Sequence, residues 1–385
     1  ENGMARTIEE ARSVAERIGY PVLVRPSYVL GGRAMVTVYD EARLDQYMET
    51  AIAASPEHPI LIDRFLEGAQ EFDVDAVADG QIVMIGGIMQ HIEHAGVHSG
   101  DSACVLPPHS ITPENLETIV NQTREMAIAL NVVGLMNVQY AIHDEEVYVL
   151  EVNPRASRTV PFVSKATGRP LAKIAARVMS GQSLQEQGYT QEAVEVDHVS
   201  VKEAVLPFNK FAGADGLLGP EMKSTGEVMG IGATFGEAFL KAQLGAGSML
   251  PSAGKVFVSV NDRDKEGVVD VARRLTQAGF ELVATGGTQS YLARHGIQAE
   301  RILKIHEGRP HVEDAIRSRD ICLVINSPQD EQSQHDDAYV RRSAILHGVP
   351  YTTTLSGAVA AATGIEALQA SPPQPRALQD YHRVG

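Results

Sequence analysis

Residues 134 to 158 read GLMNVQYAIHDEEVYVLEVNPRASR, which predicts two strands on either side of an acidic turn. The strands are expected at Gly134–Ile142 and Val147–Val152. Because residues two apart on a strand face the same side, Glu151 and Asn153 can project their oxygens into one site. If the strand that carries Gln139 pairs with theirs, three oxygen ligands converge.

Carboxylate and carboxamide oxygens suit Mg²⁺ or Mn²⁺, which keep further positions for water and nucleotide phosphates. Arg155 and Arg158 follow directly, and their guanidinium groups can hold an anionic substrate beside the metal. The alternative is that Glu151 pairs with one of these arginines at a sheet edge, while Asn153 and Pro154 form a turn. The residues alone leave both interpretations open.

The sequence before this stretch predicts antiparallel strands with helices between them, an α+β fold. Thr7 and Glu10 form a capping-box pattern that opens a helix ending at Gly19. Gly31 and Gly32 lie between two predicted strands, as a flexible flap or as an ordinary hairpin turn. The other elements expected here are strands at Val22–Arg25, Met35–Tyr39 and Ile60–Asp63, a strand pair between Glu71 and Ile92, and helices at Glu41–Ala54 and Thr112–Leu130.

Gly245–Gly254, rich in glycine, serine and proline, is the best candidate for a linker. Beyond it, short buried strands alternate with helices, which predicts a mostly parallel, doubly wound α/β domain. The expected strands are Val256–Val260, Phe280–Ala284, Ile321–Ile325 and Pro350–Thr354, and the expected helices include Asp264–Ala278 and Asp337–His347.

Composition limits the kind of partner. The chain has 385 residues and a formal net charge of −16, which argues against general nucleic-acid binding because that requires a basic surface. No apolar run approaches the ~20 residues of a membrane-spanning helix, so no membrane partner is expected. Two distant cysteines, Cys104 and Cys322, predict no disulfide and fit a reducing cytoplasm. The start at Glu1, without an initiator methionine, suggests a piece of a longer polypeptide.

Four uninterrupted strings resemble one family. They are RPSYVLGGRAM at 25–35, GVHSGDS at 96–102, GLMNVQ at 134–139 and EVNPR at 151–155. The chain resembles the large subunit of carbamoyl phosphate synthetase over essentially its whole length. The resemblance implies the second of two tandem ATP-grasp modules, without its N-terminal subdomain, followed by a methylglyoxal-synthase-like allosteric domain.

The implied reaction is the ATP-dependent phosphorylation of carbamate to carbamoyl phosphate, with ATP and Mg²⁺ or Mn²⁺ as cofactors. The implied partners are the glutaminase small subunit, the substrates ATP and carbamate, nucleotide effectors such as UMP and IMP, and further subunits in an oligomer. The fragment alone is expected to be inactive, because the missing subdomain should complete the nucleotide cleft.

The resemblance also implies roles for individual residues. Arg25 and the Gly31-Gly32 loop would contact the nucleotide phosphates, and Gln139 and Glu151 would reach them through the metal. The remaining nucleotide contacts would come from residues at the adenine and ribose and from a glycine-containing segment. These residues are Arg64, Leu66, Glu71, Gly96, Val97, His98 and Ser99. For His98, a purely structural role is the alternative.

In the C-terminal part, Thr285 to Thr288 lie where a strand should meet a helix, which is typical of an anion site. The alternative is a plain turn with a threonine N-cap. By resemblance, Lys265, Lys304 and Asn326 would close around the same effector phosphate. Catalysis by this domain is not expected, because Asn326-Ser327-Pro328 replaces the Asp-Pro step of methylglyoxal synthases.

The resulting division is an ATP-grasp subdomain with the glycine loop at 1–70, a metal-site subdomain at 71–245, a linker at 246–254 and an allosteric domain at 255–385. Two other readings remain open. One is a different ATP-grasp ligase, such as a carboxylase or a purine-pathway ligase. The other is a regulatory nucleotide-binding protein with an inactive ligase module.

Overall fold

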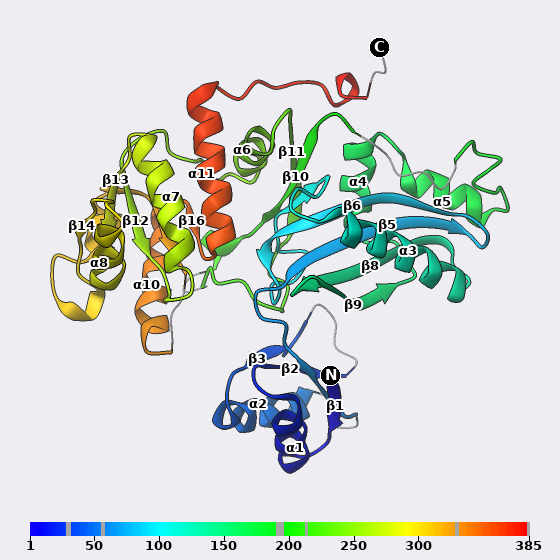
Figure 1. Ribbon diagram of the computed structural model, residues 1–385, viewed down its shortest axis with the longest axis horizontal. Helices are drawn as coiled ribbons and strands as arrows, with labels where there is room; N and C mark the ends of the chain where they lie inside the picture. Colours follow the sequence, from blue (N-terminus) through cyan, green and yellow to red (C-terminus); the bar gives the residue numbers. More distant parts are fainter. Residues whose placement is uncertain (28–31, 55–57, 190–195, 212–214, 328–330, 383–385) are drawn as a thin grey trace.

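The computed structural model describes the chain except residues 28–31, 55–57, 190–195, 212–214, 328–330 and 383–385. Three sheets organise the described residues, with four, seven and five strands. The four-stranded sheet of the N-terminal unit lies below the other two, and the five-stranded sheet of the C-terminal part stands beside the seven-stranded sheet (Figure 1).

The N-terminal unit is an antiparallel sheet in the order β1-β4-β2-β3, covered by two helices. Thr7 accepts a hydrogen bond from the Glu10 amide and Gly19 ends the first helix, which confirms the predicted caps. The elements are β1 (Asn2–Ala5), α1 (Ile8–Ile18), β2 (Val22–Pro26), β3 (Val36–Val38), α2 (Glu41–Ala54) and β4 (Ile60–Arg64).

The central unit is an antiparallel sheet in the order β11-β10-β7-β6-β5-β8-β9. Helix α3 packs through Ile119 and Ala127 against one face, and α4 and α5 pack against the other. The elements are β5 (Gln70–Asp79), β6 (Val83–His94), β7 (Cys104–Leu106), α3 (Pro113–Ala129), β8 (Val133–His143), β9 (Glu146–Asn153), α4 (Val160–Thr167), α5 (Leu171–Met179), β10 (Val199–Val205), β11 (Gly226–Gly232) and α6 (Phe235–Gly245).

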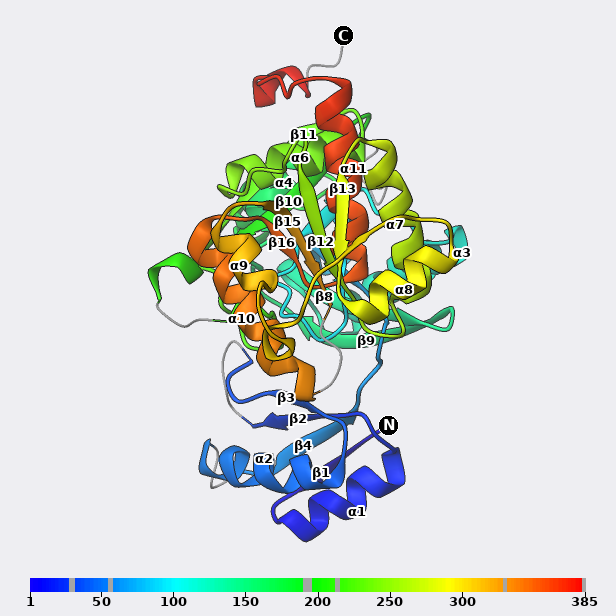
Figure 2. The ribbon, with the colours of Figure 1, turned by 90° about the vertical axis from the view of Figure 1, so that its left-hand side faces the viewer.

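The C-terminal part has a parallel sheet in the order β14-β13-β12-β15-β16, which confirms the predicted α/β order. Helices α9 and α10 lie on one side of it and α7 and α8 on the other (Figure 2). The elements are β12 (Lys255–Ser259), α7 (Lys265–Gln277), β13 (Glu281–Ala284), α8 (Gly286–Arg294), β14 (Glu300–Arg301), α9 (Val312–Arg317), β15 (Ile321–Asn326), α10 (Glu331–His347), β16 (Tyr351–Thr352) and α11 (Leu355–Ala370).

The central and C-terminal parts share one apolar core. Helix α11 packs on α6, and an added Cβ at Gly236 would lie 2.7 Å from the Thr363 carbonyl oxygen, so only glycine allows this close approach. Residues 246–254, the predicted linker, form neither helix nor strand. The fork of Arg341 also crosses between the parts, because its Nε and Nη2 each donate to an Asp215 carboxylate oxygen at 2.7 Å. No helix in the described part of the chain is long and apolar enough to span a membrane.

Candidate nucleotide and metal site

The antiparallel register of β8 and β9 brings the predicted metal ligands together. Gln139 lies opposite Glu151, and Asn137 lies opposite Asn153. The Asn153 amide donates to Glu151 Oε1 at 2.7 Å and its Oδ1 accepts from Arg155 Nη2 at 3.1 Å. Glu151 is thus hydrogen-bonded to Asn153, and no ion pair within the described residues joins it to Arg155 or Arg158. Both arginines are exposed at the edge of the sheet.

The donor chemistry of this cluster fits a hard divalent cation. Gln139 and Asn153 offer carboxamide oxygens and Glu151 offers a carboxylate, all from two neighbouring strands. Magnesium accepts such oxygens and keeps water in its other positions. In the part of the chain that the structure describes, no group of three or more histidine, cysteine, aspartate or glutamate side chains could hold a metal.

Two buried carboxylates lie behind the metal cluster on β5. Asp73 accepts from His91 Nε2 at 2.9 Å and from the Asn137 amide at 3.3 Å. Asp75 is fully buried and accepts from the same amide at 3.0 Å. Burial raises the pKa of Asp75 to about 6. Burial also acts to raise the pKa of Asp73, but the hydrogen bond and charge of His91 and the hydrogen bonds from Asn137 and Gln139 outweigh it and lower that pKa.

His91 anchors this network from β6 and also reaches a predicted ribose contact. Its Nδ1 lies 3.2 Å from Glu71 Oε2. Burial disfavours the imidazolium, but Cys104 and the hydrogen bond to Asp73 raise the pKa of His91 well above its usual value. The structure therefore places Glu71 directly against the His91 ring.

A loop around residues 219 to 222 gathers several other predicted residues. Gly32 has φ +70°, and a Cβ there would lie 1.9 Å from the Pro220 carbonyl oxygen, so the position requires glycine. The His98 amide donates to the Gly219 carbonyl at 2.8 Å. Arg158 Nη1 contacts the Met222 sulfur. The glycine loop, the His98 segment and a predicted substrate arginine thus meet at this loop, whereas Gly31 lies outside the described residues.

His98 is largely removed from solvent and its Nδ1 accepts from the Gly100 amide at 3.0 Å. Burial lowers the pKa of His98, so the ring is neutral near pH 7 and carries its proton on Nε2. That nitrogen is the donor that a phosphate oxygen could use. This geometry is compatible with both the nucleotide role and the structural role considered above.

The remaining predicted nucleotide residues are more dispersed. Arg25 Nε lies 2.9 Å from Asp63 Oδ2 between paired strands β2 and β4. Arg64 is exposed at the end of β4, and the Leu66 carbonyl accepts from the Ala69 amide at 3.2 Å. The other three are partly exposed in the segment between β6 and β7. These residues are Gly96, Val97 and Ser99.

Sequence reasoning missed several polar residues near this site. Lys202 is fully buried on β10, and its Nζ donates to the Ser102 and Ser99 carbonyls at 2.7 and 3.3 Å. Asp101 is buried and accepts from the Lys223 and Ser224 amides at 2.7 and 2.8 Å. A charge in the middle of an apolar strand, as in Val201-Lys202-Glu203, was the available signal for Lys202.

In the C-terminal part, the predicted effector residues surround the start of α8. Thr285 is its N-cap residue, and the Thr285 hydroxyl lies 3.0 Å from that of Ser259. Thr288 is buried and its hydroxyl accepts from the Val260 amide at 3.3 Å. Lys265 Nζ lies beside Gly287, 3.8 Å from where a Cβ would stand.

Two predicted effector residues lie differently. Asn326 is fully buried, and its amide donates to Asp337 Oδ1 at 3.0 Å while its Oδ1 accepts from Arg341 at 3.4 Å. Lys304 is partly exposed at the N-cap of a short 3-10 turn. Lys265 and Lys304 are therefore the more accessible of the five side chains.

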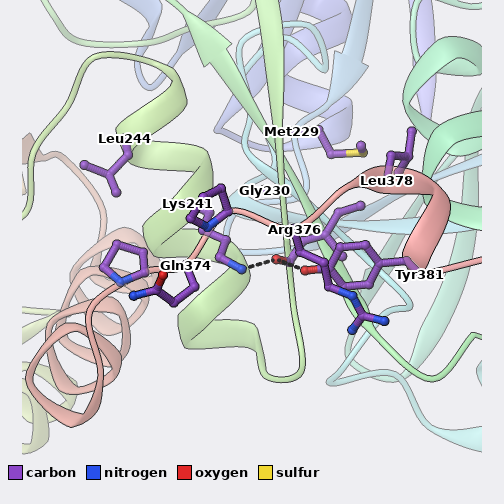
Figure 3. Close-up of a pocket in the computed structure, with 11 residues that line it drawn as sticks. Met229, Gly230, Lys241, Leu244, Gln374, Arg376, Leu378 and Tyr381 are labelled. Atoms are coloured by element: carbon purple, nitrogen blue, oxygen red, sulfur yellow. Dashed lines mark hydrogen bonds between the residues drawn. The ribbon is translucent and has the colours of Figure 1, made fainter.

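One pocket lies away from all these residues. It has a volume of about 410 Å³ between β11, α6 and the C-terminal segment (Figure 3). Lys241 and Tyr381 both donate to the Ile231 carbonyl there, at 3.0 and 3.2 Å. A second pocket lies beside β13 and α8. Neither lining contains a predicted site residue.

Comparisons with known proteins agree with this arrangement. The ATP-binding domain of the carbamoyl-phosphate synthase L chain matches residues 1–187, and the MGS-like domain matches residues 267–353. A carbamoyl phosphate synthase large chain from Methanosarcina barkeri is 54% identical over 384 residues, covering 100% of this chain and 96% of that one. The Synechocystis large chain is 58% identical over 383 residues, covering 99% of this chain.

A solved structure supports the fold of the first part. The biotin carboxylase domain of the Hydrogenobacter thermophilus 2-oxoglutarate carboxylase, in complex with MgADP, ADP and bicarbonate, is 19% identical, with a TM-score of 0.50. The match covers 62% of this chain and 58% of that chain.

The fold and the site define an ATP-grasp module joined to a methylglyoxal-synthase-like domain. The chain belongs to the carbamoyl phosphate synthase large-chain family. This membership excludes the alternative that the chain belongs to another family of ATP-grasp ligases. The chain spans about a third of the length of the Synechocystis and Archaeoglobus fulgidus relatives, with coverage of 35% and 36%.

Proposed function

We propose that this chain supplies the module that phosphorylates carbamate with ATP to give carbamoyl phosphate, and that its C-terminal domain regulates this step. The observation that carries the proposal is the cluster of Gln139, Glu151 and Asn153, with Arg155 bonded to its edge. An MGS-like domain follows the module, as expected for the second of two tandem modules.

In the proposed reaction, a carbamate oxygen attacks the γ-phosphorus of ATP, the bond from that phosphorus to the β,γ-bridging oxygen breaks, and ADP leaves. Gln139, Glu151 and Asn153 would hold Mg²⁺, which would supply positive charge to neutralise the phosphates of the nucleotide. Arg155 and Arg158 hold the carbamate in line for attack. This chemistry requires no covalent protein intermediate.

The loop of Gly32 would cover the phosphates and exclude water, which protects carbamate from decomposition. The close approach of Gly32 to the backbone at Pro220 supports this role. His98 would donate through Nε2 to a phosphate oxygen, since its Nδ1 already accepts from Gly100.

Partners and regulation belong to the same proposal. Ammonia would come from a glutaminase small subunit, and nucleotides such as UMP or IMP would bind at Lys265, Thr285, Thr288, Lys304 and Asn326. The closeness of Lys265 to the start of α8 supports a phosphate at that helix N-terminus. The Arg341–Asp215 fork offers a physical connection between the two parts.

The direct test is ATP synthesis from carbamoyl phosphate and MgADP by the full-length enzyme. Glu151→Gln removes the only carboxylate of the three-residue ligand set, so the rate should fall by about 10²-fold or more, the scale of lost transition-state electrostatics. Glu146→Gln is the matched control, because Glu146 lies on the same strand but bonds to Tyr148. Equal rates for both variants would contradict the metal assignment.

A further inference from the structure

The loop that carries Arg155 and Arg158 is tied to the sheet by two hydroxyl groups. Ser157 Oγ donates to Asp75 Oδ1 at 2.7 Å, and Thr159 Oγ1 donates to Asp75 Oδ2 at 2.7 Å. The two hydroxyl oxygens also lie 2.7 Å apart. One buried carboxylate on β5 thus receives both side chains that flank Arg158 in the sequence.

The Thr159 hydroxyl bonds to Asp75 and does not cap helix α4. Thr159 is the N-cap residue of α4, where a threonine hydroxyl usually accepts from a backbone amide of the first helical turn. Here the side chain makes no such bond and points at Asp75 instead. This hydroxyl therefore stabilises the loop before α4 and not the first turn of the helix.

Asp75 is an unfavourable residue for stability alone. It is fully buried, and its hydrogen-bond donors among the described residues are Asn137, Ser157 and Thr159, all of them neutral. Burial raises its pKa to about 6, so the folded protein resists its ionisation. A buried carboxylate without a cationic partner costs stability, which indicates a role other than packing.

We propose that Asp75 is a positioning residue, which holds Ser157 and Thr159 so that Arg155 and Arg158 face the anionic substrate beside the metal cluster. This inference rests on the proposed function, because it assigns the arginines to the substrate. The Asn137 amide connects Asp75 to Asp73, and Asn137 lies opposite Asn153 in the sheet. The same network therefore lies beneath both the arginine loop and the metal ligands.

The test uses the full-length enzyme with Ser157→Ala and Thr159→Val combined. We expect the KM for carbamoyl phosphate to rise by about tenfold or more in the ATP-forming reaction, because small displacements of positioning groups are costly. The KM for ADP should stay within about twofold of wild type, since the arginines are assigned to the substrate alone. Thr159→Ser alone keeps both hydroxyl groups, so it should have the wild-type KM for carbamoyl phosphate.

Thr123→Val is the matched control. Thr123 is also a buried helix threonine on this sheet, with its hydroxyl bonded to the Ile119 carbonyl and to Tyr140, both at 2.7 Å. It should leave both KM values unchanged. Equal rises in both KM values, or the same effect in Thr123→Val, would show a general loss of structure and overturn the positioning role.

Amide hydrogen exchange keeps this test separate from that of the proposed function. Exchange at residues 155–158 should be faster in the double variant and unchanged in Thr123→Val. Unchanged exchange in the double variant would overturn the positioning role whatever the activity. A wild-type enzyme that makes no ATP from carbamoyl phosphate would overturn the proposed function, and with it the assignment of the loop to this substrate.

Discussion

Replacing Asp75 by asparagine should change how stability depends on pH. The pKa of Asp75 is about 6 in the folded protein against an ordinary 3.8, because burial disfavours the carboxylate. Since one unit of pKa corresponds to about 1.4 kcal/mol, ionising this group costs the folded state about 3 kcal/mol more than the unfolded chain. The folded state binds the proton of Asp75 more tightly than the unfolded chain does. The contribution of this proton to the free energy of unfolding is therefore fully present below about pH 4 and is lost as the pH rises through about 6.

The assay is calorimetric melting of wild type and Asp75→Asn at pH 5 and pH 8. Relative to the variant, wild type should lose about 1.4 kcal/mol of stability between pH 5 and pH 8, or a few degrees of Tm, because the rest of the roughly 3 kcal/mol is already lost between about pH 4 and pH 5. Other titrating groups are present in both proteins, so they cancel in the difference. The asparagine variant should therefore be relatively more stable at pH 8, although it is less active.

Asp79→Asn is the control on the same strand. Burial opposes ionisation of Asp79, but the hydrogen bonds from the amides of Ile82, Leu184 and Gln81 together outweigh it and lower its pKa. The contribution of the Asp79 carboxylate to the free energy of unfolding is therefore fully present above about pH 4 and should not change between pH 5 and pH 8. If the stability difference between wild type and Asp75→Asn is also the same at pH 5 and pH 8, Asp75 is not a buried carboxylate with only neutral hydrogen-bond donors.

Three further predictions follow from single contacts. Gly32→Ala should weaken MgADP binding by about tenfold or more in a nucleotide titration, because a left-handed residue that touches backbone cannot accept a Cβ; unchanged affinity would contradict the tight loop contact. Lys265→Gln should weaken UMP or IMP binding by about tenfold in calorimetry, since a charge-assisted phosphate bond is lost. Lys255→Gln, at the other end of β12, should leave this binding unchanged. Equal affinities of Lys265→Gln and wild type would place the effector elsewhere. Arg341→Lys should lower the free energy of unfolding by about 3 kcal/mol in a denaturant titration, because a buried two-pronged bond to Asp215 is lost; a change below about 1 kcal/mol would show that the fork is dispensable.

Local patterns in the sequence were sufficient for much of the fold. Thr7 and Gly19 bound the first helix because capping is a property of a few neighbouring residues. The β8–β9 pair was predictable because an acidic turn separates two apolar runs. The parallel sheet of the C-terminal part followed from strand and helix order, although α10 begins at Glu331 and not at Asp337. That first turn is rich in polar residues, and hydrophobic periodicity did not reveal it.

The site was predictable only where its residues are close in sequence. Glu151 and Asn153 lie two apart on one strand, whereas Asp75 meets Ser157 and Thr159 across more than eighty positions. Alternation in Phe72-Asp73-Val74-Asp75 would normally indicate a solvent face, but helices cover both faces of this sheet. Tertiary burial, which no local pattern encodes, turns these carboxylates into an internal network.

The most direct measurement compares two partial reactions of the full-length enzyme carrying Glu151→Gln. One is ATP synthesis from carbamoyl phosphate and MgADP, and the other is bicarbonate-dependent ATP hydrolysis. If this chain contains the carbamate-phosphorylating module, the first rate should fall by about 10²-fold or more while the second persists. Loss of bicarbonate-dependent hydrolysis with ATP synthesis intact would contradict the account and assign the chain to the other step.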